Sequence, residues 1–380
     1  MMTTVRGLHP ETAELLRRTF QDQDTSWPKF GAPSEEVLFQ DVASQGMIPL
    51  LYRKLAAAGE DSWPQALLLR LQKTAVQQAA VELVLESDLC QLLASFAAVG
   101  VTALLLKGTP LSYTLYPEPG LRPRCDTDLL IAEEDRDKVT PLMRQMGYTP
   151  LHEAQAEYIN TQMTYARKTV QGLTCRYDLH WQVSNCNRDF SRKFNTGKLF
   201  ACAEAVPALG ENARTLSKAD ALILACFHRA GHFSHSGDRL IWLYDIHLLC
   251  QALTAQEGAR FHQRAEELQM VSLCIDAIQT AQFWFRTILS EELKNLLQER
   301  AEPEAAAFLL GKDRKEGIRK RAVLELRRMS AWQERFSYIL QNLFPPPDFM
   351  LWRYQKEKKI ILPWLYVRRF AEAVAILLRR

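Results

Sequence analysis

The chain has 380 residues, 47% of them hydrophobic, and its 47 basic residues nearly balance 44 acidic ones. A chain of this length exceeds one compact core, so we expect two or three units. The formal charge of +3 excludes the strongly basic surface of a general nucleic-acid binder. The eight cysteines form no CxxC pair, so we interpret them as reduced thiols, with Cys125 and Cys175 in core strands. The N-terminus lacks a signal peptide's hydrophobic region and no apolar run reaches the ~18 residues of a membrane span, which predicts a cytoplasmic protein.

Residues 1–98 have a helical pattern with proline and glycine breaks. We find no residues there that indicate chemistry. The spacing of apolar positions predicts four helices, at Glu11–Phe20, Ser34–Gln45, Met47–Ala58 and Pro64–Val99.

An anion-binding turn is predicted directly after this region. Val101–Leu106 is an apolar run of strand character, and Lys107 and Gly108 follow it. Thr109 suits a helix N-cap and Pro110 the first helical position, so the chain should turn at Gly108 and enter a helix. A glycine allows backbone N–H groups to approach an anion, and a helix N-terminus favours negative charge. The pattern therefore predicts a phosphate site, with the Lys107 ammonium beside it.

The next strand carries two aspartates. Asp126 and Asp128 lie one residue apart in the mostly apolar run Cys125–Ile131. Side chains alternate along a strand, so both carboxylates should point to the same face. Paired negative charges are costly without a cation, and Mg²⁺ prefers carboxylates together with substrate phosphates. The pair therefore predicts a metal site.

A third carboxylate follows on a predicted hairpin that turns at Gly172. Its second strand, Leu173–Trp181, alternates apolar residues with polar ones. Asp178 and His180 therefore share the polar face. Asp178 could complete a three-carboxylate site for two metal ions, or act as general base toward an acceptor hydroxyl.

These residues resemble the DNA polymerase β-type nucleotidyltransferase superfamily. More narrowly, the chain resembles the bacterial uncharacterised nucleotidyltransferase family in four motifs: Leu106-Lys107-Gly108, Asp126-x-Asp128, Gly147-Tyr148 and Asp178-Leu-His-Trp181. The resemblance implies an α+β core that transfers a nucleoside monophosphate (NMP) from a nucleoside triphosphate (NTP) and releases pyrophosphate. It also implies metal binding by the three aspartates and phosphate contact by Gly108 and Thr109. Members often accompany polysaccharide or natural-product gene clusters. The chain departs from the superfamily's usual Gly-Gly or Gly-Ser, since it has Lys-Gly-Thr at the turn.

For each of three further residues near the predicted site, the sequence allows two different roles. Lys107 could neutralise phosphate charge or be a solvated lysine at a strand end. Arg124, two residues before Asp126, would share the carboxylate face and either contact a phosphate or hold a carboxylate in place. His180 could orient a neighbouring group rather than react.

A later helical segment adds candidates for a substrate cleft. Ser217 to about Phe233 is predicted to be a helix, with His228 and His232 on one face. They could bind zinc, but no glutamate follows the first histidine, which favours core or cleft histidines. The resemblance extends to Arg239 and Asp245, and Asp245 could contact substrate or anchor a nearby arginine through a buried pair.

The C-terminal region is basic. Lys312–Arg321 should be solvated, and a helix over Ala322–Leu343 should stop at the prolines that follow. Trp352–Arg380 mixes basic and apolar residues. Such a tail could lie on an anionic membrane or bind a polyanion, but packing on its own domain is favoured.

Together the patterns predict an α+β fold in four segments: a helical region (1–98), the nucleotidyltransferase core (99–210), a helical domain (211–310) and a basic helical tail (311–380). We expect two Mg²⁺ ions, with Mn²⁺ as an alternative, an NTP and an acceptor that the sequence does not identify. Two alternatives are a toxin-like enzyme that modifies proteins and a catalytically silent nucleotide-binding scaffold. Oligomeric state is not predicted.

Overall fold

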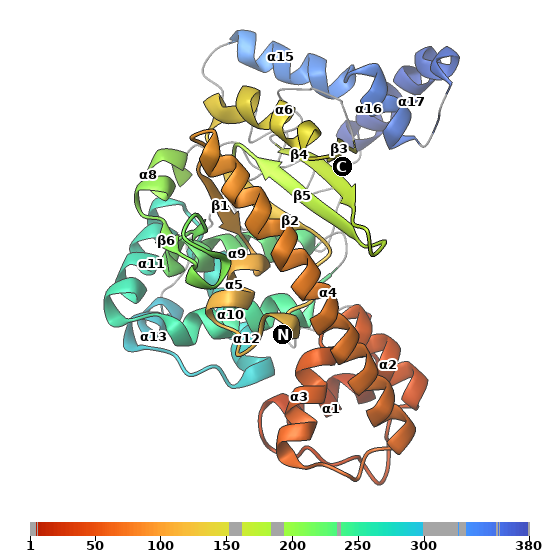
Figure 1. Ribbon diagram of the computed structural model, residues 1–380, viewed down its shortest axis with the longest axis vertical. Coiled ribbons are helices and arrows are strands. Elements are labelled where there is room, and N and C mark those ends of the chain that lie inside the picture. The colour runs from red at the N-terminus through yellow and green to blue at the C-terminus, as the bar shows by residue number, and fades with distance from the viewer. Residues whose placement is uncertain are drawn as a thin grey trace. The chain divides into compact units, whose positions relative to one another are not determined.

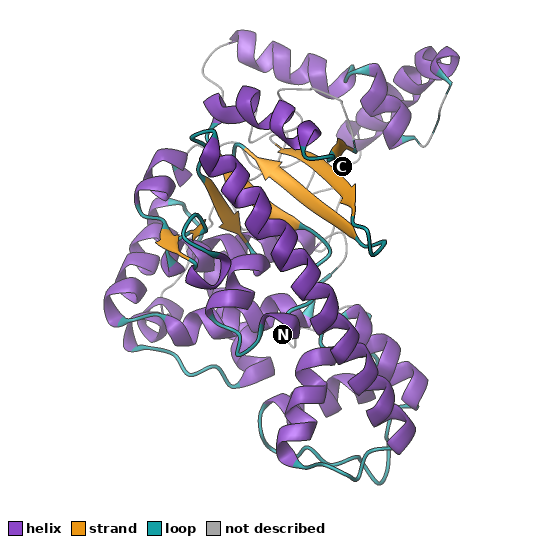
Figure 2. Ribbon diagram, viewed as in Figure 1, coloured by secondary structure: helices purple, strands orange, loops and turns teal. Residues whose placement is uncertain are grey.

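The computed structural model describes residues 5, 7–151, 162–183, 194–233, 237–298, 326, 332–354, 356 and 358–378. Helices and a single mixed sheet make up this part of the chain (Figure 2). The predicted α+β class is confirmed. No helix within these ranges is both long and apolar enough to cross a bilayer.

Seven strands form the sheet, in the order β3-β4-β5-β2-β1-β7-β6. β2 and β5 pair in parallel, whereas β4 pairs with β5 and β3 with β4 in antiparallel fashion. Their bounds are β1 (Ala103–Leu106), β2 (Thr127–Ile131), β3 (Thr149–Pro150), β4 (Gln162–Lys168), β5 (Thr174–His180), β6 (Glu204–Ala205) and β7 (Arg214–Thr215).

Burial along the strands follows their sequences. Every residue of β1 and β2 is buried, as expected for central strands of an apolar run. On β5, Cys175, Tyr177 and Leu179 are buried while Thr174 and Arg176 are exposed, as the predicted alternation requires. His180, predicted on the polar face, is buried as well. β2 begins later than expected, at Thr127. Cys125 therefore lies before the strand and is exposed, so its predicted place in a core strand is wrong.

The chain divides into two compact units that are interleaved along the sequence, whereas the four expected segments were contiguous. Unit 1 comprises residues 1–93, 105–125 and 202–310, and unit 2 comprises residues 94–104, 126–201 and 311–380. Two of the boundaries fall within β1 and directly before Asp126.

Unit 1 is mostly helical. The four predicted N-terminal helices are present, and the last of them, α4, is long and continues past the end of this unit (Figure 1). Further along the chain, α9 packs against α11, and α10 packs against α9 and α12. The helices are α1 (Pro10–Phe20), α2 (Glu35–Ser44), α3 (Ile48–Ala58), α4 (Gln65–Ala98), α5 (Gly108–Thr114), α9 (Lys218–Phe233), α10 (Leu240–Ala252), α11 (Ala255–Glu267), α12 (Val271–Phe285) and α13 (Glu291–Gln298).

Unit 2 holds β2 to β5 and the C-terminal helices. Met350, Leu351 and Leu365 form a small core of their own between α16 and α17. The predicted basic stretch 312–321 lies outside the described residues. Helices of this unit are α6 (Arg136–Gln145), α8 (Thr196–Ala201), α15 (Trp332–Leu343), α16 (Pro347–Arg353) and α17 (Leu362–Leu378).

The tail packs on itself only in part. Although Leu365 is fully buried, Trp364, Val367 and Phe370 on the same helix are exposed, as is Ile360 just before it. The expectation that the tail buries its apolar side therefore holds for one side of α17.

Candidate metal and phosphoryl-transfer site

Asp128 and Asp178 meet across two parallel strands. The register of β2 and β5 pairs Asp128 directly with Asp178. Paired positions of neighbouring strands project to the same face about 4.8 Å apart, so the two carboxylates lie side by side. Asp128 is buried, with 6% of its surface exposed, and Asp178 is half-buried. The predicted convergence of Asp178 with the Asp-x-Asp segment is therefore present for Asp128.

Two neutral side chains of β4 orient Asp178. Thr164 Oγ1 donates to Asp178 Oδ1 at 2.6 Å, and Gln162 Nε2 lies 3.4 Å from Asp178 Oδ2. Both come from the strand next to β5, where Thr164 pairs with Asp178 and Gln162 with His180. A polar row thus crosses β4, β5 and β2 on one face of the sheet. The hairpin of β4 and β5 carries most of this row (Figure 1).

His180 joins the same group. Its Nε2 lies 2.9 Å from Asp128 Oδ1, and the residue is 3% exposed. Its other ring nitrogen, Nδ1, is buried and meets no hydrogen-bond partner in the described part of the chain. One possible ligand atom each from Asp128, Asp178 and His180 lies within 4.8 Å of the other two.

The buried carboxylate of Asp128, the half-buried one of Asp178 and the histidine beside them form a donor set that fits a divalent cation. Adjacent negative charges removed from water are costly unless a cation compensates them. Carboxylate oxygens and an imidazole nitrogen are also metal ligands. The half-exposure of Asp178 leaves one side of the group accessible to a substrate.

Asp126 lies outside this group of three. It precedes the first residue of β2 and is exposed. The expectation that it shares a strand face with Asp128 depended on a strand starting at Cys125. Since β2 starts at Thr127, strand alternation does not fix the direction of Asp126.

The turn after β1 differs from the prediction in detail. α5 begins at Gly108, and the residue before it, Lys107, has the positive φ of 58°. We expected Gly108 to turn the chain and Thr109 to cap the helix. Lys107 occupies the N-cap position instead, and Thr109 is buried inside the first turn. A lysine in a conformation that favours glycine marks local strain of the kind found at functional sites.

Position 108 requires a glycine because of Arg122, a residue that the sequence pattern did not indicate as part of the site. A Cβ at Gly108 would overlap the Arg122 guanidinium. Arg122 Nε and Nη2 donate to the two carboxylate oxygens of Asp245 at 3.1 and 2.7 Å, and Tyr116 donates to Asp245 Oδ1 at 2.7 Å. Burial, together with the Asp245 carboxylate, raises the pKa of the Tyr116 hydroxyl well above its ordinary value, so the hydroxyl keeps its proton. Asp245 therefore anchors a buried arginine, one of its two predicted alternatives.

A methyl group at position 108 should displace this arginine. We expect Gly108→Ala to lower the free energy of unfolding by about 1–3 kcal/mol, the range for overpacking a buried contact. The same substitution in an Arg122→Ala background should cost much less, because the overlapping guanidinium is gone. Urea denaturation of the four chains measures this coupling.

Gly231→Ala is the matched control, since an added Cβ there meets no atom within 4 Å. It should leave stability unchanged or raise it slightly because alanine favours helix. Equal losses from Gly108→Ala with and without Arg122 would contradict the assigned contact.

Arg124 is paired with Glu82 of α4. The shortest contact, from Arg124 Nη2 to Glu82 Oε1, is 2.8 Å, and both side chains are 3% exposed. Tyr113 donates to the same carboxylate at 2.6 Å, and its pKa is raised by burial and by this bond. Of the two roles predicted for Arg124, the structure shows the one in which it pairs with a carboxylate.

His228 and His232 pack on one another and on Trp242. Their ring centroids lie 4.5 Å apart, and each lies about 5 Å from the Trp242 ring (5.0 and 5.2 Å). Arg239 lies over the same indole at 5.6 Å. The structure thus confirms that the two histidines share a helix face. Neither belongs to the group of possible metal ligands found among the described residues.

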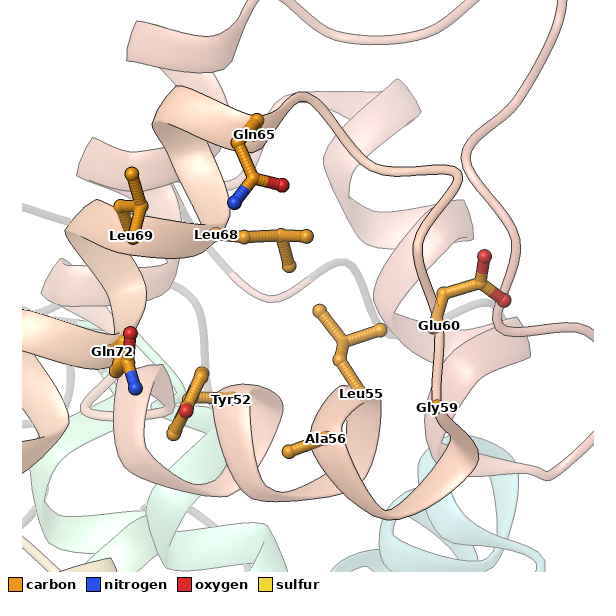
Figure 3. Close-up of a pocket in the computed structure, with 9 residues that line it drawn as sticks. All are labelled: Tyr52, Leu55, Ala56, Gly59, Glu60, Gln65, Leu68, Leu69 and Gln72. Carbon is orange, nitrogen blue, oxygen red and sulfur yellow. The ribbon is translucent and has the colours of Figure 1, made fainter.

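A separate pocket of about 220 Å³ lies between α3 and the start of α4. Figure 3 shows Leu55 and Leu68 pointing into it, with Glu60 at its edge. None of its lining residues was predicted as a site residue.

Two carboxylates side by side on parallel strands, with a histidine next to them, can hold a metal ion of the kind that assists phosphoryl transfer. The chain matches the family described as uncharacterised nucleotidyltransferase over residues 34–286, about two thirds of its length, and it belongs to this family. The matched region extends on both sides of the motifs that carried the sequence resemblance, from Leu106 to Asp245. It makes the chain an enzyme of the nucleotidyltransferase class. No curated protein matches it.

Proposed function

We propose that the enzyme transfers an NMP from an NTP to a hydroxyl or similar acceptor, with release of pyrophosphate, and that it requires a divalent metal. The observation that carries the proposal is the pairing of Asp128 with Asp178 beside the buried His180. Asp128 is buried and Asp178 half-buried, and a cation between two neighbouring carboxylates lowers the cost of placing their charges together. A polysaccharide or natural-product pathway remains our expectation for its context.

In this proposal Asp128 and Asp178 hold the metal, and Asp126 adds a carboxylate when substrate binds. The metal supplies Lewis-acid stabilisation of phosphate charge and acidifies the attacking hydroxyl. Mg²⁺ is the ion expected from the sequence, two ions being the usual complement of such a site. Thr164 and Gln162 keep Asp178 in one orientation, which pre-organises the site before substrate arrives.

The turn at Lys107, Gly108 and Thr109 is proposed to bind the NTP phosphates. Backbone N–H groups at the start of α5 and the Lys107 ammonium suit an anion. The Arg122 guanidinium, held by Asp245, lies where a side chain at position 108 would be, so the turn requires glycine there. Positioning and electrostatic stabilisation would then supply most of the rate.

Binding and turnover can be tested separately. We expect isothermal titration to show saturable binding of at least one NTP with Mg²⁺ or Mn²⁺, and a panel of hydroxyl acceptors to give metal-dependent pyrophosphate release. An NTP labelled at the α-phosphate then reports where the NMP goes. Label on a small molecule supports the proposal.

Two other outcomes identify the alternatives. Label on a protein would indicate a modifying enzyme. Nucleotide binding without pyrophosphate release across the panel would indicate a silent scaffold, and it would refute the proposed transfer.

For the tail we propose peripheral contact with an anionic membrane or polyanion. Support comes from Trp364 and Val367, exposed on α17 beside Arg368. For the compartment we propose the cytoplasm, since the seven cysteines in the described ranges carry no disulfide.

A further inference from the structure

We propose that side chains at the end of α9 and the start of α10 form the subsite for the nucleobase of the NTP. Four residues make up this α9–α10 cluster: His228, His232, Arg239 and Trp242. The inference rests on the proposed phosphate site at the turn after β1, and it adds the residues that would recognise the other end of the substrate.

The cluster brings planar side chains together at an accessible place. The rings of His228 and His232 lie 5.0 and 5.2 Å from the ring of Trp242, between centroids. The central guanidinium carbon of Arg239 lies 5.6 Å from the centroid of the same indole. His232 is exposed, and Trp242 and Arg239 are half-buried. Unlike a group packed inside a core, the cluster therefore has a side that a ligand can contact.

The chemistry of these side chains suits a nucleobase. Bases stack on aromatic side chains, histidine and tryptophan included, and on the plane of an arginine guanidinium. Such stacking accepts any base, because every base has a π-face. The four side chains include no carboxylate, so they suit a flat, neutral group better than a metal ion.

Contacts within unit 1 connect the cluster with the proposed phosphate site. Trp242 and Asp245 are three residues apart on α10, so their side chains are neighbours on one face of this helix. Asp245 accepts hydrogen bonds from Arg122 at 3.1 and 2.7 Å, and the Arg122 guanidinium fills the space beside Gly108. α10 also packs against α5, which begins at Gly108. A nucleotide with its phosphates at the turn therefore has the cluster within reach of its base.

A buried ion pair holds the cluster in one geometry. Arg229, next to His228, is fully buried, and its Nε and Nη2 each donate to one carboxylate oxygen of Asp238 at 2.7 Å. Asp238 directly precedes Arg239, so this bidentate pair ties the position of Arg239 to α9. A buried ion pair is often no more stabilising than apolar residues of similar size. We therefore interpret this one as a device that arranges the cluster before a ligand arrives, which lowers the cost of binding.

Isothermal titration of the full chain with two probes separates base binding from phosphate binding. Inorganic tripolyphosphate with Mg²⁺ reports on the turn alone, whereas an NTP with Mg²⁺ reports on the turn and the base subsite together. We expect the wild type to bind at least one NTP more tightly than tripolyphosphate. Trp242→Leu should weaken NTP binding by about 5- to 150-fold, the range for loss of one base–aromatic stack. Its tripolyphosphate binding should stay unchanged.

Further variants separate stacking from packing. Because His232 is exposed, His232→Ala is expected to leave the fold intact and still weaken NTP binding. His232→Phe restores a ring and should recover the affinity. Trp27→Leu is the matched control: Trp27 is also half-buried and packs edge-on against Trp63, with ring centroids 5.0 Å apart. This variant should keep wild-type NTP affinity.

The outcomes distinguish the subsite from the proposed transfer. Unchanged NTP affinity in both Trp242→Leu and His232→Ala would overturn the inference and leave the transfer standing. Equal losses of NTP and tripolyphosphate binding would also overturn it, because the cluster would then act through the turn or the fold. A selective loss of NTP binding, in an enzyme that releases no pyrophosphate, supports the subsite while refuting the transfer. A wild type that binds no NTP would refute both.

Discussion

Asp128→Asn is expected to lower metal-dependent pyrophosphate release by roughly 10³-fold, or about 4 kcal/mol of transition-state stabilisation. Asparagine keeps the size of the side chain but removes the charge that we propose holds a cation, and it changes the partner of His180 Nε2. Metal affinity, measured by isothermal titration, should fall in parallel. Circular dichroism should show an intact fold, because the substitution is nearly isosteric.

Asp137→Asn provides the control for this experiment, since Asp137 is an exposed aspartate of the same unit, in the first turn of α6. It should retain wild-type turnover. Asp178→Asn should match Asp128→Asn, because each removes one of the two paired charges. A fully active Asp128→Asn enzyme would show that the carboxylate pair does not perform the chemistry.

Arg122→Met is expected to lower the free energy of unfolding by about 3–5 kcal/mol, since it leaves the Asp245 carboxylate buried without its cation. The side chains of Arg122 and Asp245 are only 10% and 6% exposed. The double variant Arg122→Met/Asp245→Leu should recover most of that loss, because both charges are gone and apolar groups fill the space. Urea denaturation of the two single variants and the double variant gives the coupling energy.

Arg368→Met is the control that tests whether the loss of any ion pair, buried or exposed, lowers the free energy of unfolding. Arg368 and Glu372 form an exposed pair, with side chains 50% and 41% exposed, so its loss should change stability little. If the Arg122 and Asp245 variants were additive, the buried pair would not be the unit that holds the turn.

The strands β1, β2, β4 and β5, and the shared face of Asp178 and His180, could be predicted from the sequence because they depend on local periodicity. The short strands β3, β6 and β7 carried no such pattern. Alternation along Leu173–Trp181 was enough to place Asp178 and His180 on one face, and the apolar runs of β1 and β2 marked buried strands. Asp126 shows the limit of such reasoning. Its expected direction depended on where the strand begins, and strand ends depend on hydrogen bonding that the pattern does not record.

The contacts around the turn could not be predicted, because they join residues far apart in the chain. Arg122 meets Asp245 on a helix that follows more than 100 residues later, and Arg124 meets Glu82 about 40 residues earlier. Both arginines precede the same strand, and the sequence alone gave no reason to separate their roles. A glycine next to a lysine suggested phosphate binding, whereas the glycine's missing side chain also makes room for the Arg122 guanidinium.

The polar row across β4, β5 and β2 limits how this hairpin can change in length. A slip of β4 by one residue against β5 would bring Met163 and Tyr165 to the positions that Gln162 and Thr164 now hold, opposite His180 and Asp178, since such a slip exchanges the two faces of a strand. Asp178 would then lose both donors at once. Extra residues between Thr169 and Leu173, where Val170 is almost fully exposed, would leave every pairing in place. Natural length variation in this hairpin should therefore be confined to its loop.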